Sequence, residues 1–148
     1  MLFKRKELFT EEQTQQIVQA IRAAERLTSG EIRVFVEHKC RFVKPLDRAI
    51  QLFGKLGMHK THHRNAVLLY VALKDRQLAI YGDAGIHEKV SESYWHEQLQ
   101  ALKTHFSDGR IVEGIAHCVT RIGEVLQLHF PYESDDDNQL PDDIVFGR

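Results

Sequence analysis

The chain is poor in cysteine and has no long apolar run, and each absence excludes a class of protein. Its two cysteines, Cys40 and Cys118, lie far apart and match no spacing typical of a metal site or a redox motif. We expect two free thiols, which fits a reducing compartment. No segment approaches the roughly 20 consecutive apolar residues that a membrane-spanning helix requires. Glu11, Glu12 and Gln13 follow the basic N-terminus where a signal peptide would be apolar, so we expect a soluble, cytoplasmic protein.

An excess of positive charge is also missing. The 20 basic residues are balanced by 21 acidic ones, which gives a net charge of −1. Proteins that bind nucleic acid usually carry a basic patch or an overall basic excess, so we expect no nucleic-acid partner.

The acidic groups gather at the C-terminal end of the chain. Residues 131–148 carry a charge of −5, so the rest of the chain carries +4. We expect one domain over residues 1–130 and an acidic, mostly disordered tail over residues 131–148. The last apolar residues of this tail, Ile144, Val145 and Phe146, have two possible positions: on a partner or on the body of the domain.

Hydrophobic periodicity predicts a single α/β domain. Apolar residues recur at helical spacing in four segments, and β-branched or alternating apolar runs mark three strands. The expected helices cover residues 11–27, 45–56, 86–106 (with a candidate break near Ser91–Ser93) and 111–128, and the expected strands cover residues 31–38, 66–73 and 77–81.

The order of these elements predicts the fold class. A β-α-β crossover makes the first two strands parallel, and the short link Lys74-Asp75-Arg76 makes the last two an antiparallel hairpin. We expect a three-layer α/β/α sandwich whose small mixed sheet is mostly parallel and contains one antiparallel hairpin.

Strand direction brings three oxygen-bearing side chains to one end of this sheet. Glu31 begins the first strand and Asn65 precedes the second, which runs parallel to it. The third strand runs the opposite way, so Asp83, which follows it, returns to the same end. Two carboxylates and an amide oxygen are ligands that suit Ca²⁺ or Mg²⁺ better than Zn²⁺.

The turn after the third strand adds to this candidate metal site. Gly82 and Gly85 permit a close approach of the backbone to a ligand, and Glu88, at the start of the next helix, completes the set of candidate metal ligands. A structural interpretation of the same residues stays open. In it, Glu31 is a surface charge, Asp83 caps the following helix and Asn65 caps the start of its strand.

Histidines lie close to the same end of the sheet. In the segment MHKTHHR, His59 and His63 would share a face if they were helical and could then bind Zn²⁺, but the preceding glycine favours a loop. Together with Arg64 and His87, His63 could form a basic rim that attracts an anion such as phosphate. His87 is also a candidate general acid or base, or a purely structural residue. No nucleophile, phosphate-loop or dinucleotide motif appears.

Three segments resemble the TPM domain family: TSGEIRVFVE, RNAVLLYVALKDRQLAIYGDAGI and FSDGRIVEGI. The resemblance covers about residues 10–128 and implies a compact α/β/α domain. In some members of that family a divalent metal binds near the glycine-rich turn, and acid phosphatase activity has been assigned to plant members. The turn of this chain, YGDAGIHE, departs from the usual V-G-Y-G-L-E-G pattern, and Ala66 replaces the common glycine after Asn65.

The combined expectation is a domain that binds Ca²⁺ or Mg²⁺ and contacts an unknown protein partner. The alternative is a metal-dependent acid phosphatase that acts on a small phosphorylated substrate. The chain resembles the short, soluble branch of the family.

Overall fold

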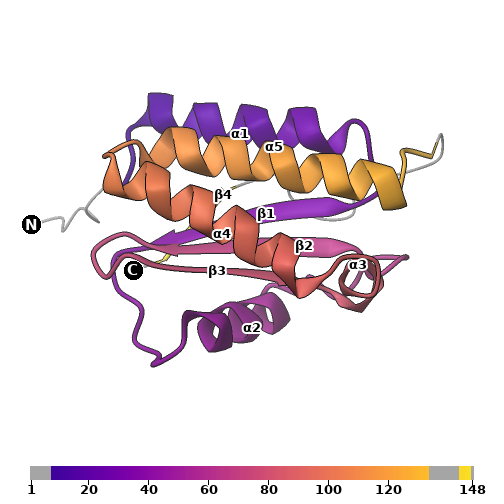
Figure 1. Cartoon of the computed structure of the whole chain (residues 1–148), viewed down its shortest axis with the longest axis horizontal. Helices are drawn as coiled ribbons and strands as arrows, with labels where there is room; N and C mark the ends of the chain where they lie inside the picture. Colours follow the sequence, from indigo (N-terminus) through magenta and orange to yellow (C-terminus); the bar gives the residue numbers. More distant parts are fainter. Residues whose placement is uncertain (1–7, 134–143, 148) are drawn as a thin grey trace, which may run out of the picture.

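A mixed sheet of four strands forms the middle layer of the fold (Figure 1). The computed structural model describes residues 8–133 and 144–147. The strands are β1 (Glu31–Glu37), β2 (Ala66–Ala72), β3 (Gln77–Gly82) and β4 (Ile144–Phe146), and they lie side by side in the order β3-β2-β1-β4. β1 is parallel to both β2 and β4, whereas β2 and β3 are antiparallel. The predicted mixed, mostly parallel sheet with one hairpin is confirmed.

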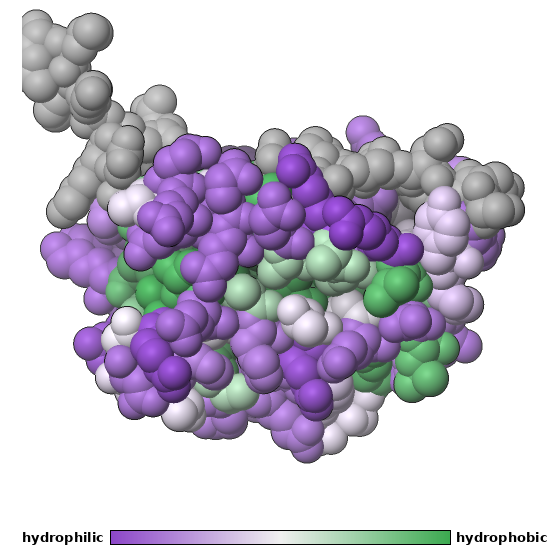
Figure 2. Space-filling model, turned by 90° about the horizontal axis from the view of Figure 1, so that it is seen from above, coloured by the Kyte–Doolittle hydropathy of each residue, from purple (hydrophilic) through white to green (hydrophobic). Residues whose placement is uncertain are grey.

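Helices cover both faces of this sheet. Helices α1 (Glu11–Glu25), α4 (Glu92–Ser107) and α5 (Ile111–His129) lie on one face, and α2 (Pro45–Lys55) lies alone on the other (Figure 1). The short helix α3 (Ala84–His87) follows β3 at the end of the sheet. Seen from above, the layer of α1, α4 and α5 presents a mostly hydrophilic surface with apolar residues showing in patches (Figure 2). The predicted three-layer arrangement is confirmed.

Alternation along the strands divides the core into two parts. Ile32, Val34 and Val36 of β1 belong to the larger apolar cluster, under α1, α4 and α5, while Phe35 belongs to the smaller cluster under α2. All residues of β2 are buried because this strand has neighbours on both edges and helices over both faces.

Local capping explains the helix boundaries. The hydroxyl of Thr10 accepts from the N–H of Gln13, and the side chain of Gln13 accepts from the N–H of Thr10, so the two residues form a capping box at the start of α1. The expected break in the third helix is present: α3 ends at His87, and Ser91 caps α4 by accepting from the N–H of Tyr94 at 3.3 Å.

The C-terminal apolar residues lie on the body of the domain. Residues Ile144–Phe146 pair with Val34–Val36 of β1, and the N–H of Gly147 donates to the carbonyl of Val36 at 2.7 Å. The rest of the predicted tail after Glu133, residues 134–143 and 148, lies outside the described residues. Of the two positions considered for this segment, the structure has the one on the body, where β4 covers one edge of the sheet.

The structure also bears on the two predictions made for the cysteines and for membrane-spanning helices. Cys40 and Cys118 are both free, and burial raises the pKa of the Cys118 thiol to about 12. Within residues 8–133 and 144–147, no helix is long and apolar enough to cross a bilayer. A cytoplasmic location stays a prediction.

A buried ion pair fixes α2 to the sheet. The guanidinium of Arg48 donates twice to the carboxylate of Glu37, at 2.9 and 3.0 Å, and the hydroxyl of Tyr70 donates to the same carboxylate. Glu37 is 4% exposed and Tyr70 is fully buried, and this burial raises the pKa of Tyr70. Because the Glu37 carboxylate is buried beside Arg48, its partner on α2 is required for stability.

We predict that Arg48→Ala lowers the free energy of unfolding by about 3 kcal/mol, because it leaves a buried carboxylate without its cation. Urea denaturation of the full chain measures the change. The control is Arg121→Ala, which removes an exposed pair with Glu124 at 3.5 Å and should cost less than about 1 kcal/mol. Equal costs for the two variants would contradict the structural role assigned to Arg48.

Candidate functional site

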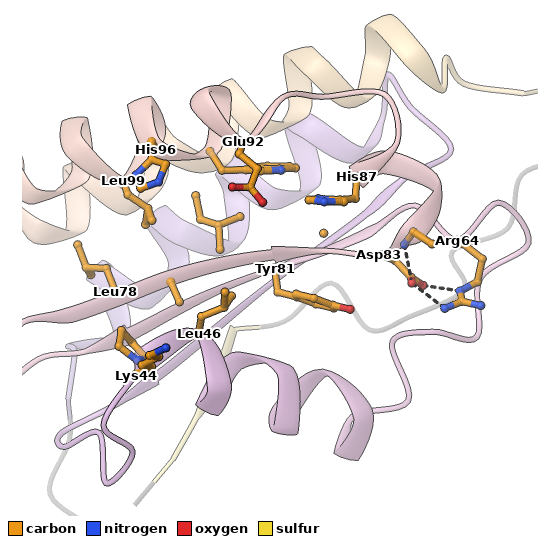
Figure 3. Close-up of a pocket in the computed structure, with 16 residues that line it drawn as sticks. Lys44, Leu46, Arg64, Leu78, Tyr81, Asp83, His87, Glu92, His96 and Leu99 are labelled. Carbon is orange, nitrogen blue, oxygen red and sulfur yellow. Dashed lines mark hydrogen bonds and ion pairs between the residues drawn. The ribbon is translucent and has the colours of Figure 1, made fainter.

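A cleft runs along the free edge of β3. Its volume is about 610 Å³, within the ~300–1,000 Å³ typical of ligand sites. Residues 78–82 of β3 form its floor, the start of α2 forms one wall, and α3 and α4 form the other (Figure 3). The floor includes Leu78 and Tyr81, and the walls include Lys44, Leu46, His87, Glu92, Trp95, His96 and Leu99. We call this hollow the β3 cleft.

An ion pair between Arg64 and Asp83 closes one end of the β3 cleft (Figure 3). Nε and Nη2 of Arg64 donate to the two carboxylate oxygens of Asp83, at 2.7 and 2.8 Å. These hydrogen bonds raise the pKa of the Arg64 guanidinium. The Asp83 side chain is 2% exposed and that of Arg64 is 54% exposed, so a buried anion faces outward toward a cation that lies largely in solvent.

Asp83 also holds the adjoining backbone. Its Oδ1 accepts from the N–H of Ala84 at 2.7 Å, at the N-cap of α3. Its own N–H donates to the carbonyl of Ala66 at 2.9 Å, which extends the β2–β3 ladder by one pair. The structural alternative for this residue, that it caps the following helix, is therefore confirmed.

Gly85 explains how α3 comes close enough to hold this arrangement. The N–H of Gly85 donates to the carbonyl of Arg64 at 2.8 Å. A Cβ at residue 85 would lie 2.1 Å from the carbonyl oxygen of His63 and 2.7 Å from that of Arg64. Only glycine permits this approach. Arg64 itself has a positive φ of 51°, an uncommon conformation for a residue with a side chain.

The backbones of Glu31, Asn65 and Asp83 lie at the same end of the sheet, as strand direction predicts. Glu31 pairs with Ala66, the residue after Asn65, and Asp83 bonds to Ala66 from the other side. Glu31 is 4% exposed, so its interpretation as a surface charge is wrong. Alternation along β1 places Glu31 on the α2 face of the sheet with Phe35.

The side chains at this end of the sheet differ in how well they fit a cation. Asn65 is fully buried; its Nδ2 donates to Ser29 Oγ at 3.3 Å, and its Oδ1 has no hydrogen-bond partner among the described residues. Glu31 has a polar partner of its own, and Glu88 is exposed at the end of α3. Asp83 already holds Arg64.

The described part of the chain contains no group of three His, Cys, Asp or Glu side chains placed to hold a metal ion. A cation at this end of the sheet would therefore need Asn65 Oδ1 or main-chain carbonyls beside the two carboxylates. Oxygen ligands of these kinds are the ones that Ca²⁺ accepts.

The predicted basic rim is divided between two places. Arg64 and His87 line the β3 cleft, as the rim requires. His63 instead lies 3.5 Å from a carboxylate oxygen of Glu133, and its ring is tilted against that of Phe130, with 6.1 Å between the ring centroids. His59 and His63 lie between α2 and β2 and not in a helix, which agrees with the loop favoured from the sequence.

Sequence reasoning missed the β3 cleft as a whole. Trp95 is 7% exposed and belongs to the larger core cluster, but it also lines the cleft. Its Nε1 is buried and has no acceptor among residues 8–133 and 144–147. Lys44 and Leu46 belong to no recognisable sequence motif, so nothing in the sequence marks them as cleft residues. The one available signal was the hairpin, since its second strand can end a sheet and leave a free edge.

Comparisons with known proteins agree with this architecture. A family model described as the TPM domain matches residues 2–125. Among solved structures, the BA42 protein of the psychrophilic bacterium Bizionia argentinensis is 39% identical, covers 97% of this chain and 99% of its own, and has a TM-score of 0.88. The N-terminal domain of the cg2496 protein of Corynebacterium glutamicum is 14% identical, covers 90% of this chain and 80% of its own, and at a TM-score of 0.63 supports the fold alone. No curated protein matches the chain.

We predict that Gly85→Ala destabilises the protein by about 3 kcal/mol or more, because the new methyl group collides with main-chain atoms that cannot move alone. Thermal and urea denaturation measure the effect. The matched control is Gly54→Ala in α2, where a Cβ meets no atom within 4 Å; there we expect a gain of about 0.5–1 kcal/mol from helix propensity. A Gly85→Ala variant as stable as the parent would show that α3 does not depend on this contact.

Proposed function

The chain belongs to the TPM domain family, and on that premise we propose that it binds a divalent cation, Ca²⁺ or Mg²⁺, at the end of its sheet and contacts another protein there. The proposed ligands are Glu31, Asn65 and Asp83, with Glu88 from the end of α3. The cation orders the end of the β3 cleft, where the partner binds.

The observation that carries this proposal is the environment of Asp83. A carboxylate that is 2% exposed sits at the mouth of a cleft, and its charge is balanced by a guanidinium that is 54% exposed. Burying an anion costs free energy unless a cation accompanies it. The cation used here comes from a flexible side chain that solvent can reach, so another cation can replace it without a rearrangement of the sheet.

The neighbouring side chains supply oxygen atoms for such an exchange. Glu31 and Asp83 flank the small residue Ala66 on adjacent sides, and two strand spacings put their backbones about 10 Å apart. Paired residues share a face of the sheet, so both carboxylates leave the sheet on the α2 face with Ala66. A cation placed between them would be shared by both. The unpartnered Oδ1 of Asn65 is a third candidate donor, since Ca²⁺ takes amide and carboxylate oxygens alike.

Arg64 is the competitor in this scheme. While its guanidinium holds Asp83, the carboxylate oxygens are occupied. Bound metal and the Arg64–Asp83 pair therefore exclude each other. Removal of the Arg64 charge should therefore raise the affinity for the cation. If the Arg64–Asp83 pair only stabilised the fold, the same change would not raise that affinity.

We predict that Ca²⁺ shifts the amide signals of residues 31, 65 and 83 in an NMR titration of the full chain. Asp83→Asn should weaken the apparent Ca²⁺ affinity by roughly tenfold or more, because one ligand charge is lost. Arg64→Gln should lower the melting temperature without metal but make Ca²⁺ stabilise the variant more than it stabilises the parent, by linkage. The control, Asp108→Asn, changes an exposed carboxylate beside Arg110 and should leave the titration unchanged.

The metal proposal is contradicted if Ca²⁺ and Mg²⁺ move no signal at this end of the sheet. It is also contradicted if Arg64→Gln lowers stability and gains nothing from either ion. In that case the Arg64–Asp83 pair is only a structural contact.

The acid phosphatase alternative has one feature in its favour, since Arg64 and His87 both line the β3 cleft and an arginine with a histidine can hold a phosphate. We nevertheless predict that the protein with Mg²⁺ or Ca²⁺ releases phosphate from para-nitrophenyl phosphate no faster than a Glu31→Gln/Asp83→Asn double variant. A hydrolase also needs a base positioned to activate water. The Asp83 carboxylate is not placed for that role, because it accepts hydrogen bonds from Arg64 and from the N–H of Ala84. Release that depends on both carboxylates would establish the phosphatase instead.

A further inference from the structure

We propose that the β3 cleft binds an extended segment of another protein by strand addition, with the bound segment pairing along the free edge of β3. This inference rests on the protein-contact half of the proposed function and is independent of its metal half. It names the class of partner: a chain of about five residues in β conformation, the length of the cleft floor.

The pairing between β2 and β3 determines which main-chain groups face the cleft. In an antiparallel pair, residues alternate between those bonded to the neighbouring strand and those that point away from it. Because the N–H of Asp83 bonds to Ala66, the register makes Tyr81 and Ala79 the bonded residues of β3. The N–H and C=O groups of Leu78, Ile80 and Gly82 then point away from β2. No further strand lies beyond β3 in the sheet formed by the described residues.

This edge is recessed, which distinguishes it from an ordinary exposed edge. Leu78, Ala79 and Ile80 are 6%, 3% and 7% exposed, although β3 is the last strand of the sheet. The reason is that α2 packs beneath β3, with Phe53 against Tyr81 at 4.9 Å between ring centroids, and α4 packs above it. A second copy of this fold would bring its own α2 and α4 into collision with these walls. A single extended segment fits between them.

The walls of the cleft predict the side chains of this segment. Successive residues of a strand point to opposite sides, so a segment paired with β3 turns alternate side chains toward α2 and toward α4. Leu46 on the first side and Leu99 on the second offer apolar contacts (Figure 3). The occupant should therefore be apolar on both faces near its centre.

Two charges specify the segment further. Lys44 lies on the α2 side and Glu92 on the α4 side of the cleft (Figure 3). Neither takes part in any ion pair of the described residues. The complementary segment carries an acidic residue on its α2-facing side and a basic residue on its α4-facing side. This requirement for opposite charges on opposite faces distinguishes an extended segment from a small anion. A small anion would bind beside Arg64 and His87 only.

The experiment begins with a selection of random octapeptides, displayed on phage, against the full chain in EDTA. Leu46→Trp, at a cleft residue that is 44% exposed, fills the cleft and serves for counter-selection. An enriched peptide is then synthesised in three forms: unmodified, N-methylated at its odd residues and N-methylated at its even residues. N-methylation removes a main-chain donor, so strand addition predicts that one methylated form loses roughly tenfold or more in affinity while the other stays within about threefold.

A charge exchange tests the predicted orientation. Lys44→Glu should weaken a peptide with an acidic residue opposite Lys44 by roughly fivefold or more, and should restore affinity for the peptide in which that acid is replaced by lysine. Lys55→Glu, at an exposed lysine in the last turn of α2 that does not line the cleft, is the matched control and should change neither affinity. The Asp83→Asn variant reports separately on the metal.

Three results would overturn the inference. One is a selection that yields the same peptides on the parent and on Leu46→Trp. Another is equal affinity of both methylated forms. A third is a concentration-dependent dimer that Leu46→Trp dissociates, which would make a second copy the occupant. Peptide binding that proceeds in EDTA while Ca²⁺ moves no signal upholds this inference and overturns only the metal proposal.

Discussion

Every strand of a sheet has to satisfy main-chain groups on two sides, and this requirement determines where the functional part of the molecule lies. β2 is paired on both sides, and β1 is paired with β2 and, over Val34–Val36, with β4. The outer edges of β3 and of the three-residue strand β4 remain, and the edge of β3 is the longer one. Helices α2 and α4 pack against the two faces of this last strand and extend past it, so the free edge becomes the floor of a cleft and not an exposed surface. The hazard of an unpaired edge, association with other edges, is thereby reduced, while a single chain retains access.

Asp83 connects this cleft to the end of the sheet. It continues the β2–β3 ladder, caps α3 and balances the charge of Arg64. The proposed role in binding a cation is compatible with these structural duties. The main-chain N–H and the cap bond from Ala84 to Oδ1 hold the fold, while Oδ2 and the second lone pair of Oδ1 accept from Arg64. Exchange of one cation for another there would change the surface of the cleft without changing its walls. For this reason the metal and the partner are expected to share one end of the molecule.

Much of this arrangement could be predicted from the sequence because it depends on short-range rules. The hairpin over residues 66–82, the parallel crossover before it and the helix break at Ser91 follow from periodicity and capping, and the structure confirms all three. The meeting of Glu31, Asn65 and Asp83 followed from strand direction alone. Side-chain burial did not follow, because it depends on which helix covers which face.

The features that escaped prediction join segments that are far apart in the chain or lack a local pattern. The left-handed backbone of Arg64 has no sequence signal, since neither glycine nor asparagine marks it. The two walls of the β3 cleft come from the starts of α2 and α4, at residues 45 and 92, which are about a third of the chain apart, and no periodicity in the sequence predicts that they meet. The position of Ile144 beside β1 was one of two possibilities, and only the paired register decides between them.

Hydrogen exchange of individual amides in the free, full-length protein measures directly which main-chain groups of β3 lack partners. We expect an alternating pattern: the amides of Ala79 and Tyr81, bonded to β2, exchange slowly, while those of Leu78, Ile80 and Gly82 exchange faster by roughly tenfold or more. Uniform slow exchange along residues 78–82 would mean that the edge of β3 is already paired or covered. An edge in that state could not accept an added strand, so the β3 cleft would not be a strand-binding site.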